Sequence, residues 1–187
     1  MKKCSICVAT VSVLSLTLSG FVTGCARQDA AEKTVAAPSA EAPSVDGSAV
    51  VLTAEPEGAQ EVIAARKNAG DEEQIVLVGR IGGSENPWVD GRAAFSIVDL
   101  SLQACSDIPG DTCPHPWDYC CQTDKLPNAT ALVKLVNADG DVIKQDAREL
   151  LNVKELATVV IRGKAQRDDA GNLTVLADGV FIKNTKD

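Results

Sequence analysis

Short runs of β-branched and aliphatic residues, separated by turns rich in glycine and aspartate, constrain the fold of this chain more than any other feature. Such runs are typical of strands. They predict five strands, at residues 75–81, 93–100, 131–136, 157–165 and 173–182. Between the third and fourth strands, residues 146–151 have a helical pattern with an aspartate that can cap its start. Residues 56–68 predict a short N-terminal helix.

The order of these elements is that of the OB-fold, a small five-stranded Greek-key barrel. Particular strand residues carry the resemblance. They are Val-Gly-Arg-Ile at 78–81, Phe-Ser-Ile-Val-Asp at 95–99, Val-Ile-Arg-Gly-Lys at 160–164 and Asn-Leu-Thr-Val at 172–175. These segments resemble OB-fold domains of the anticodon-binding and nucleic-acid-binding families, over about residues 74–183. The resemblance implies a mainly β barrel with a helix between strands three and four. The main departure from it is a cysteine-rich loop insertion at residues 102–128.

The N-terminus has the features of an export signal. Two lysines follow Met1, an apolar stretch covers residues 8–21, and Val-Thr-Gly precedes Cys25. This arrangement closely resembles the bacterial lipobox, in which the signal is cleaved before a cysteine that receives a diacylglyceryl group. The resemblance implies that residues 1–24 are removed and that Cys25 anchors the protein to a membrane of the cell envelope. The alternative is an ordinary secretory signal followed by a chance cysteine. Ala26 is not the aspartate that commonly retains such proteins in the inner membrane, so the outer membrane is favoured.

The rest of the chain divides into a tether and one domain. Residues 26–48 are rich in Ala, Pro, Ser and Glu and have no apolar periodicity, which is typical of a flexible linker. Residues 49–187 suffice for one domain with its own core. We therefore expect a signal peptide at 1–24, a lipid-anchored tether at 25–48 and an OB-fold-like domain at 49–187.

The acidic charge of the chain bears on its partners. The formal net charge is −8, and removal of Lys2 and Lys3 with the signal lowers it to about −10. A nucleic-acid-binding surface needs clustered Lys and Arg, together with aromatic side chains on which bases stack. The aromatic fraction is only 3%. Charge and composition therefore argue against a single-stranded nucleic acid as the partner, although the barrel resemblance suggests one.

Four cysteines are expected to remain in the mature domain. The chain has seven cysteines; Cys4 and Cys7 would leave with the signal and Cys25 would carry the lipid. The four are Cys105, Cys113, Cys120 and Cys121. An extracytoplasmic location permits disulfide formation.

Two disulfide pairings are compatible with this spacing, since a bond between the adjacent Cys120 and Cys121 would strain the peptide between them. One joins 105 to 120 and 113 to 121, and the other joins 105 to 121 and 113 to 120. Either pairing would staple the loop and reduce the entropic cost of ordering it.

Metal binding is the alternative interpretation of the same cluster. Thiolates of Cys105, Cys113, Cys120 and Cys121, together with the single histidine, His115, are ligands for Zn(II) or Cu(I). The cysteine spacing differs from that of common structural zinc sites. A labile, redox-active disulfide is a third interpretation.

Three large aromatic residues fall in predicted loops. Trp88, Trp117 and Tyr119 are candidates to anchor a partner protein or a glycan. In the alternative interpretation they are packing residues, with Trp88 closing one end of the barrel and the other two fixing the insertion to it.

Signals for catalysis are weak. No Ser-His-Asp or Cys-His pattern with an evident base is present, and Gly79, Gly82 and Gly83 do not form a phosphate-binding loop. The sequence therefore predicts a non-enzymatic, lipid-anchored binding module without a cofactor. Its ligand would be a protein, a small molecule or an envelope polymer. The alternative is a metal-handling or thiol-redox lipoprotein.

Overall fold

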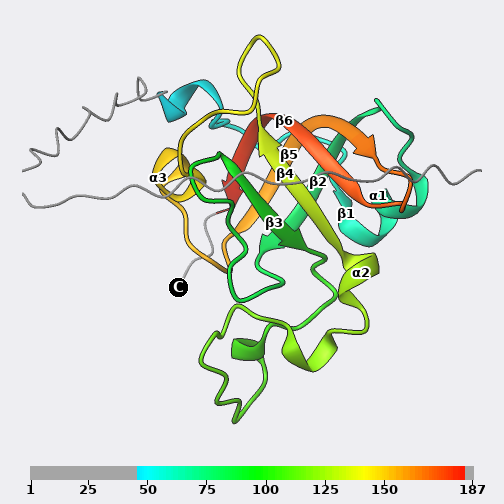
Figure 1. The fold of residues 1–187 in the computed structure, drawn as a ribbon, viewed down its shortest axis with the longest axis vertical. Coiled ribbons are helices and arrows are strands. Elements are labelled where there is room, and N and C mark those ends of the chain that lie inside the picture. Colours follow the sequence, from blue (N-terminus) through cyan, green and yellow to red (C-terminus); the bar gives the residue numbers. More distant parts are fainter. Residues whose placement is uncertain (1–45, 184–187) are drawn as a thin grey trace, which may run out of the picture. The chain divides into compact units, whose positions relative to one another are not determined.

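The computed structural model describes residues 46–183, and the predicted signal, Cys25 and most of the tether lie outside this range. Six strands and a few short helices make up the described part (Figure 1). Its elements are η1 (Gly47–Ala49), β1 (Gln60–Glu61), α1 (Val62–Asn68), β2 (Gln74–Ile81), β3 (Ala94–Val98), η2 (Cys105–Asp107), η3 (Cys120–Gln122), α2 (Leu126–Ala129), β4 (Thr130–Leu135), α3 (Ala147–Leu151), β5 (Thr158–Arg167) and β6 (Leu173–Lys183).

Five of the strands close into a barrel. β2 pairs antiparallel with both β3 and β5, β3 with β4, and β5 with β6. A parallel pairing of β4 with β6 completes the circuit, and β1 adds a short parallel pairing to β2 outside it. The predicted mainly β, five-stranded OB-fold-like barrel, with a helix between its third and fourth strands, is confirmed.

Alternate residues of each strand fill the barrel, as the period of two in a strand requires. Phe95 and Ile97 from β3, Val133 from β4, Ile161 from β5 and Val175 from β6 are all fully buried. Some intervening positions, such as Ser96, face outward and are partly exposed, whereas others, such as Val98, are buried in a second cluster outside the barrel core. This alternation is the pattern on which the strand predictions rested.

A glycine permits the tightest approach between β5 and β6. The register of this pair shifts between Arg162 and Gly163, which marks a β-bulge. A Cβ atom on Gly163 would lie 2.2 Å from the carbonyl oxygen of Leu176 and 2.7 Å from the Cα of Ala177. Only glycine fits where the two long strands bend to close the barrel.

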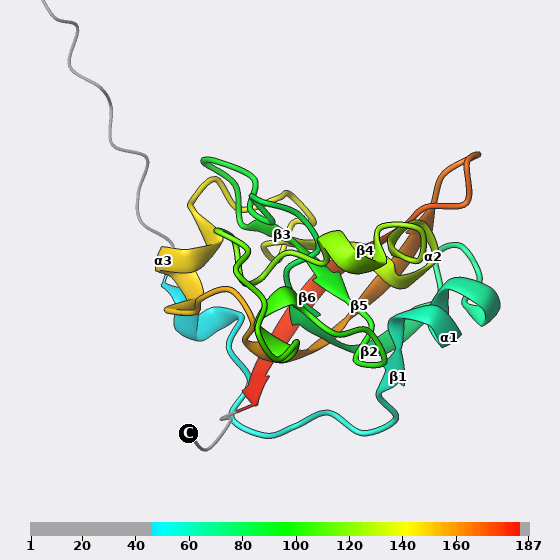
Figure 2. The ribbon, with the colours of Figure 1, turned by 90° about the horizontal axis from the view of Figure 1, so that it is seen from below.

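Helices α3 and α1 lie at opposite sides of the barrel (Figures 1 and 2). α3 begins at Asp146, whose carboxylate accepts a hydrogen bond from the backbone N–H of Arg148 at 2.9 Å, so the predicted cap is confirmed. Leu150 and Leu151 of α3 are buried in the core. Within residues 46–183, no helix has the length and apolar character needed to span a membrane.

The N-terminal helix begins later than predicted. Its expected start is near Pro56, whereas α1 starts at Val62. Gln60 and Glu61 instead pair with Leu77 and Val78 of β2, so an edge pairing with the barrel displaces the first predicted turn of the helix. The predicted end near residue 68 is correct.

Candidate functional site

The segment between β3 and β4, residues 99–129, forms a packed lobe on one side of the barrel (Figure 1). It contains η2, η3 and α2 and corresponds to the predicted insertion at 102–128. We refer to it as the insertion. Its apolar cluster is separate from the barrel core and comprises Val98, Leu102, Ala104, Tyr119 and Ala129. The insertion therefore has an interior of its own.

Asp99 fixes the base of the insertion. It is the one charged residue in the buried set of the described part, with a relative exposure of 1%. One carboxylate oxygen accepts a hydrogen bond from the backbone N–H of Ile63 at 2.7 Å, and the other accepts bonds from the N–H and hydroxyl of Ser101. The backbone N–H of Asp99 donates to the carbonyl of Ala129 at 2.9 Å. These bonds satisfy the buried carboxylate and join the two ends of the insertion.

An ion pair ties η2 to the barrel wall. The guanidinium of Arg80 on β2 donates to both carboxylate oxygens of Asp107, and its Nε donates to the carbonyl of Leu156 at 3.2 Å. The hydrogen bond from Arg80 lowers the pKa of Asp107, and the same bond raises the pKa of Arg80. Two parallel N–H···O bonds fix orientation as well as distance.

Three cysteine sulfurs converge in the insertion. The Sγ atoms of Cys105, Cys113 and Cys120 all lie within 4.8 Å of one another. The closest pair is Cys105 and Cys120, at 3.2 Å. Cys105 is buried, Cys113 is half-buried and Cys120 is exposed, so the cluster opens to solvent on one side. We call these three residues the sulfur triad.

Backbone hydrogen bonds bring the triad together. The N–H of Cys105 donates to the carbonyl of Asp118 at 2.8 Å, and the N–H of Ser106 donates to the carbonyl of Pro116 at 2.9 Å. These bonds pair the start of η2 with the segment that leads into Cys120. The thiol of Cys113 donates to the carbonyl of His115 at 3.4 Å, which directs its sulfur toward the same place.

The surroundings of Cys105 and Cys120 raise the pKa of both thiols. Burial raises the pKa of the Cys105 thiol. The hydrogen bond with Cys105 lowers the pKa of Cys120, but desolvation and the neighbouring sulfurs of Cys121 and Cys113 raise it overall. Nucleophilic cysteines depend on a lowered pKa. Cys105 and Cys120 lack this property.

Neither predicted disulfide pairing is formed in the described chain, where no two cysteine sulfurs are at bonding distance. A disulfide requires a sulfur separation of about 2 Å. The 3.2 Å pair, Cys105 and Cys120, belongs to the first of the two predicted pairings. In that pairing, the second disulfide would join Cys113 to Cys121. The disulfides therefore stay a prediction.

The structure groups three of the five predicted metal ligands. His115 lies outside the group, because its Nε2 is 3.4 Å from a carboxylate oxygen of Glu85 and its ring meets the edge of Trp117. Cys121 also lies outside, although its sulfur is 3.9 Å from that of Cys120. The candidate metal centre is therefore the sulfur triad alone.

Two of the three candidate binding aromatics are packing residues. Trp88 is buried against Phe95, and its Nε1 donates to Glu155 at 2.6 Å. Tyr119 is fully buried in the insertion. Trp117 is partly exposed and donates from Nε1 to the carbonyl of Glu85 at 2.9 Å. Of these three aromatic side chains, only that of Trp117 is accessible to solvent.

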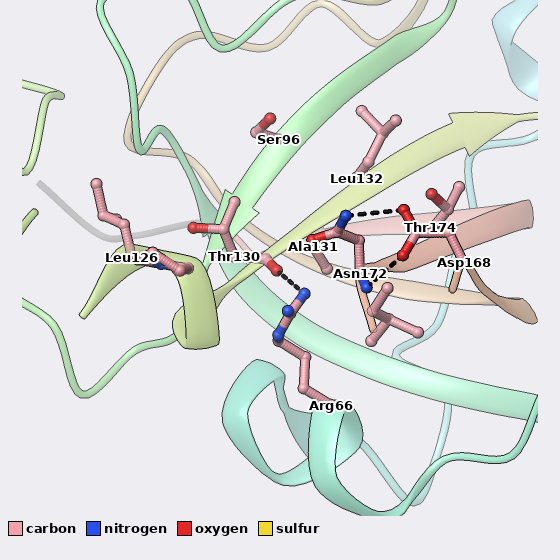
Figure 3. Close-up of a pocket in the computed structure, with 11 residues that line it drawn as sticks. Arg66, Ser96, Leu126, Thr130, Ala131, Leu132, Asp168, Asn172 and Thr174 are labelled. Carbon is pink, nitrogen blue, oxygen red and sulfur yellow. Dashed lines mark hydrogen bonds between the residues drawn. The ribbon is translucent and has the colours of Figure 1, made fainter. Parts of the chain in front are cut away.

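A shallow hollow of about 350 Å³ lies on the outer face of β3 and β4, between α2 and the turn that joins β5 to β6 (Figure 3). Arg66 reaches into it from α1 and donates to the carbonyls of Thr130 at 2.9 Å and Gly171 at 3.2 Å. On the opposite side, Asp168 accepts hydrogen bonds from Asn172. The charged side chains that line the hollow therefore already have hydrogen-bond partners, which are backbone carbonyls for Arg66 and Asn172 for Asp168.

Several residues that position the site were not predicted from the sequence. Asp99 had a detectable signal, because it continues the inward alternation of Phe95 and Ile97 and an acid there implies a buried hydrogen-bonding role. Arg80 and Arg66 had no such signal in the sequence, because the groups that they bind are distant in the chain. Asp107, for example, is 27 residues from Arg80.

Comparison with known proteins does not assign the chain to a family. No protein-family model matches the chain, and a search of curated proteins finds no similar sequence.

Proposed function

We propose that this protein is a lipid-anchored, extracytoplasmic binding module without catalytic activity, and that the insertion is its binding element. The observation that carries the proposal is the fastening of a long, irregular segment to a rigid barrel. Irregular segments of this length in compact domains are commonly functional, and binding residues are concentrated on loops held by a scaffold.

The insertion is ordered by contacts that need no disulfide. Asp99 joins its ends, Arg80 binds Asp107 on η2, and Tyr119 fills its apolar interior. A loop that is already ordered loses less conformational entropy when a partner docks. Trp117, which is partly exposed on this ordered segment, is the side chain that we propose contacts the partner.

A site-specific photocrosslinking experiment in living cells tests the binding role. A photoreactive amino acid replaces Trp117 in the full-length protein, and a matched control places it at Ala138. Ala138 is exposed and belongs to the turn after β4. This turn lies at the end of the barrel opposite the insertion (Figure 1). We expect a discrete adduct from position 117 and none from position 138. Equal adducts from both positions, or no adduct from position 117, would contradict the proposal.

The proposed membrane anchor rests on the lipobox resemblance at Cys25 and has a separate test. We expect the wild-type protein to enter the detergent phase of an envelope extract and to begin at an acylated Cys25. Cys25→Ser should stay in the aqueous phase and lack the acyl mass. Identical partitioning of the two proteins would exclude the anchor without affecting the crosslinking result.

A further inference from the structure

We propose that Cys105, Cys113 and Cys120 form a three-sulfur binding site for Cu(I). This inference goes beyond the binding-module function, because it assigns a ligand to the accessible sulfur cluster and does not depend on a partner at Trp117. It rests on the convergence of three sulfurs from three separate points of the insertion.

The spacing of the sulfurs suits one shared metal ion. With a metal–thiolate bond of about 2.3 Å, three sulfurs around one ion in a plane lie about 4 Å apart. The three Sγ atoms lie within 4.8 Å of one another, with a shortest separation of 3.2 Å. Small side-chain rotations would therefore bring all three into a trigonal arrangement.

The number and type of ligands favour Cu(I) over Zn(II). Structural zinc sites use four protein ligands in a tetrahedron. The two residues that could supply a fourth ligand are outside the group, with His115 next to Glu85 and Cys121 beyond the triad. Soft thiolates select Cu(I), and this d¹⁰ ion is satisfied by three of them.

The nearby carboxylates are already hydrogen-bonded. Asp111 accepts the N–H of Cys113 at 2.9 Å, Asp118 accepts the N–H of Tyr119 at 2.7 Å, and Asp107 binds Arg80. Within the described residues, no carboxylate oxygen joins the group of three sulfurs, so the ligand set is soft. Cys105 forms the buried floor of the site and Cys120 its exposed rim, which gives the ion a path of entry.

Binding would exchange protons for metal. Each thiol that coordinates loses its proton to solvent, so one Cu(I) entering the triad releases up to three protons, with no change in the oxidation state of copper or sulfur. A disulfide between Cys105 and Cys120 would remove two of the three ligands. The site therefore exists only in the reduced protein.

The test uses the mature protein, purified under reducing, anaerobic conditions and titrated with Cu(I) in competition with bicinchoninate. We expect one equivalent of Cu(I) to bind. Cys113→Ser and Cys120→Ser should each weaken the affinity more than about a hundredfold, since even second-shell changes cost 10–100-fold. Cys121→Ser is the matched control and should bind as the wild type does. Circular dichroism establishes that each variant is folded.

Several outcomes would overturn the proposal. One is the absence of stoichiometric Cu(I) binding, and another is unchanged affinity in Cys113→Ser and Cys120→Ser. Tight binding of Zn(II) that requires Cys121 as much as the triad would replace the three-sulfur site with a four-ligand one. A parallel experiment traps thiols with an alkylating agent in intact cells. Two disulfides in the trapped protein, with no metal, would also exclude the site.

Discussion

The carboxylate of Asp99, at the end of β3, caps helix α1 by accepting the backbone N–H of Ile63 at 2.7 Å. The residue at the N-cap position itself, Glu61, makes no capping bond with its side chain. Asp99, which is 36 positions after Ile63, thus satisfies one of the donors that every helix start leaves free. The bond ties the folding of α1 to the base of the insertion.

Replacement of Asp99 should therefore destabilise the whole domain. We expect Asp99→Ala to lower the free energy of unfolding by about 1–3 kcal/mol, because it leaves the N–H of Ile63 without its buried partner. Asp99→Asn retains one acceptor and should cost less. Asp141→Asn, at an exposed position, is the control. Urea denaturation measures all three, and a change in Asp99→Ala no larger than that of the control would contradict the prediction.

The ion pair between Arg80 and Asp107 should make the insertion sensitive to acid. The hydrogen bond from Arg80 holds the pKa of Asp107 below its ordinary value of 3.8. The pair therefore contributes its full stability above about pH 4, and this contribution is lost as the pH falls through the lowered pKa of the folded state.

We accordingly expect the stability difference between the wild type and Asp107→Asn to be largest near neutral pH and to shrink below about pH 4. Asp124→Asn makes the same charge change at an exposed position of the insertion and serves as control. Hydrogen exchange of residues 104–122 should be faster in Asp107→Asn at neutral pH and unchanged in Asp124→Asn. A difference that stays constant with pH would rule out the pairing.

Tyr119 provides an optical probe of the interior of the insertion, because it is the only tyrosine in the chain. Burial raises its pKa to about 12, from an ordinary value of 10.0. The unfolded chain ionises first, so the free energy of unfolding should fall as the pH rises from about 10 to about 12, by up to about 1.4 kcal/mol per pH unit. Absorbance of tyrosinate should show a midpoint near 12 in the folded protein and near 10 in denaturant. A folded midpoint near 10 would contradict the burial.

The hydroxyl of Tyr119 has no hydrogen-bond partner within the described residues. Tyr119→Phe should therefore keep or increase stability at neutral pH, because it removes an unsatisfied buried polar atom. It should also abolish the alkaline loss of stability between about pH 10 and about pH 12. A marked loss of stability at neutral pH would indicate that the hydroxyl makes a bond.

Gly163 should be irreplaceable at the bulge between β5 and β6. An added Cβ would meet backbone atoms of Leu176 and Ala177, which cannot rotate away. We expect Gly163→Ala to lower the free energy of unfolding by about 3 kcal/mol, the upper end of what overpacking usually costs. Gly70→Ala is the control, because its Cβ would approach only the flexible side chain of Glu73. Thermal melts of the two variants should differ clearly, and similar melting temperatures would refute the close approach.

The barrel was predictable because its information is local. Alternation places Phe95 and Ile97 inward, and the aspartate at 146 marks a helix start, so strand order and the helix α3 follow from short windows of sequence. The start of α1 was not predictable in this way. It depends on the pairing of Gln60 with Leu77 and on a cap supplied by Asp99, the residue that follows β3.

The sequence predicted which residues belong to the candidate site, but not how those residues are arranged in space. The sequence nominated the cysteines and His115, whereas the grouping of three sulfurs follows from backbone bonds between Cys105 and Asp118 and between Ser106 and Pro116. No periodic pattern in the sequence predicts those hydrogen bonds. The same applies to the aromatic residues, since nothing local distinguishes the buried Tyr119 from the accessible Trp117.

The hydrogen bond between Asp99 and Ala129 means that the chain leaves the barrel and re-enters it at one point. Immediately inside that point, Val98 and Thr130 face each other in the ladder of β3 and β4. The intervening residues are thus an appendage whose two ends meet at a single rung of the β3–β4 ladder. Substitutions within this appendage can therefore alter the surface that the barrel presents without changing the rung at which the appendage joins it.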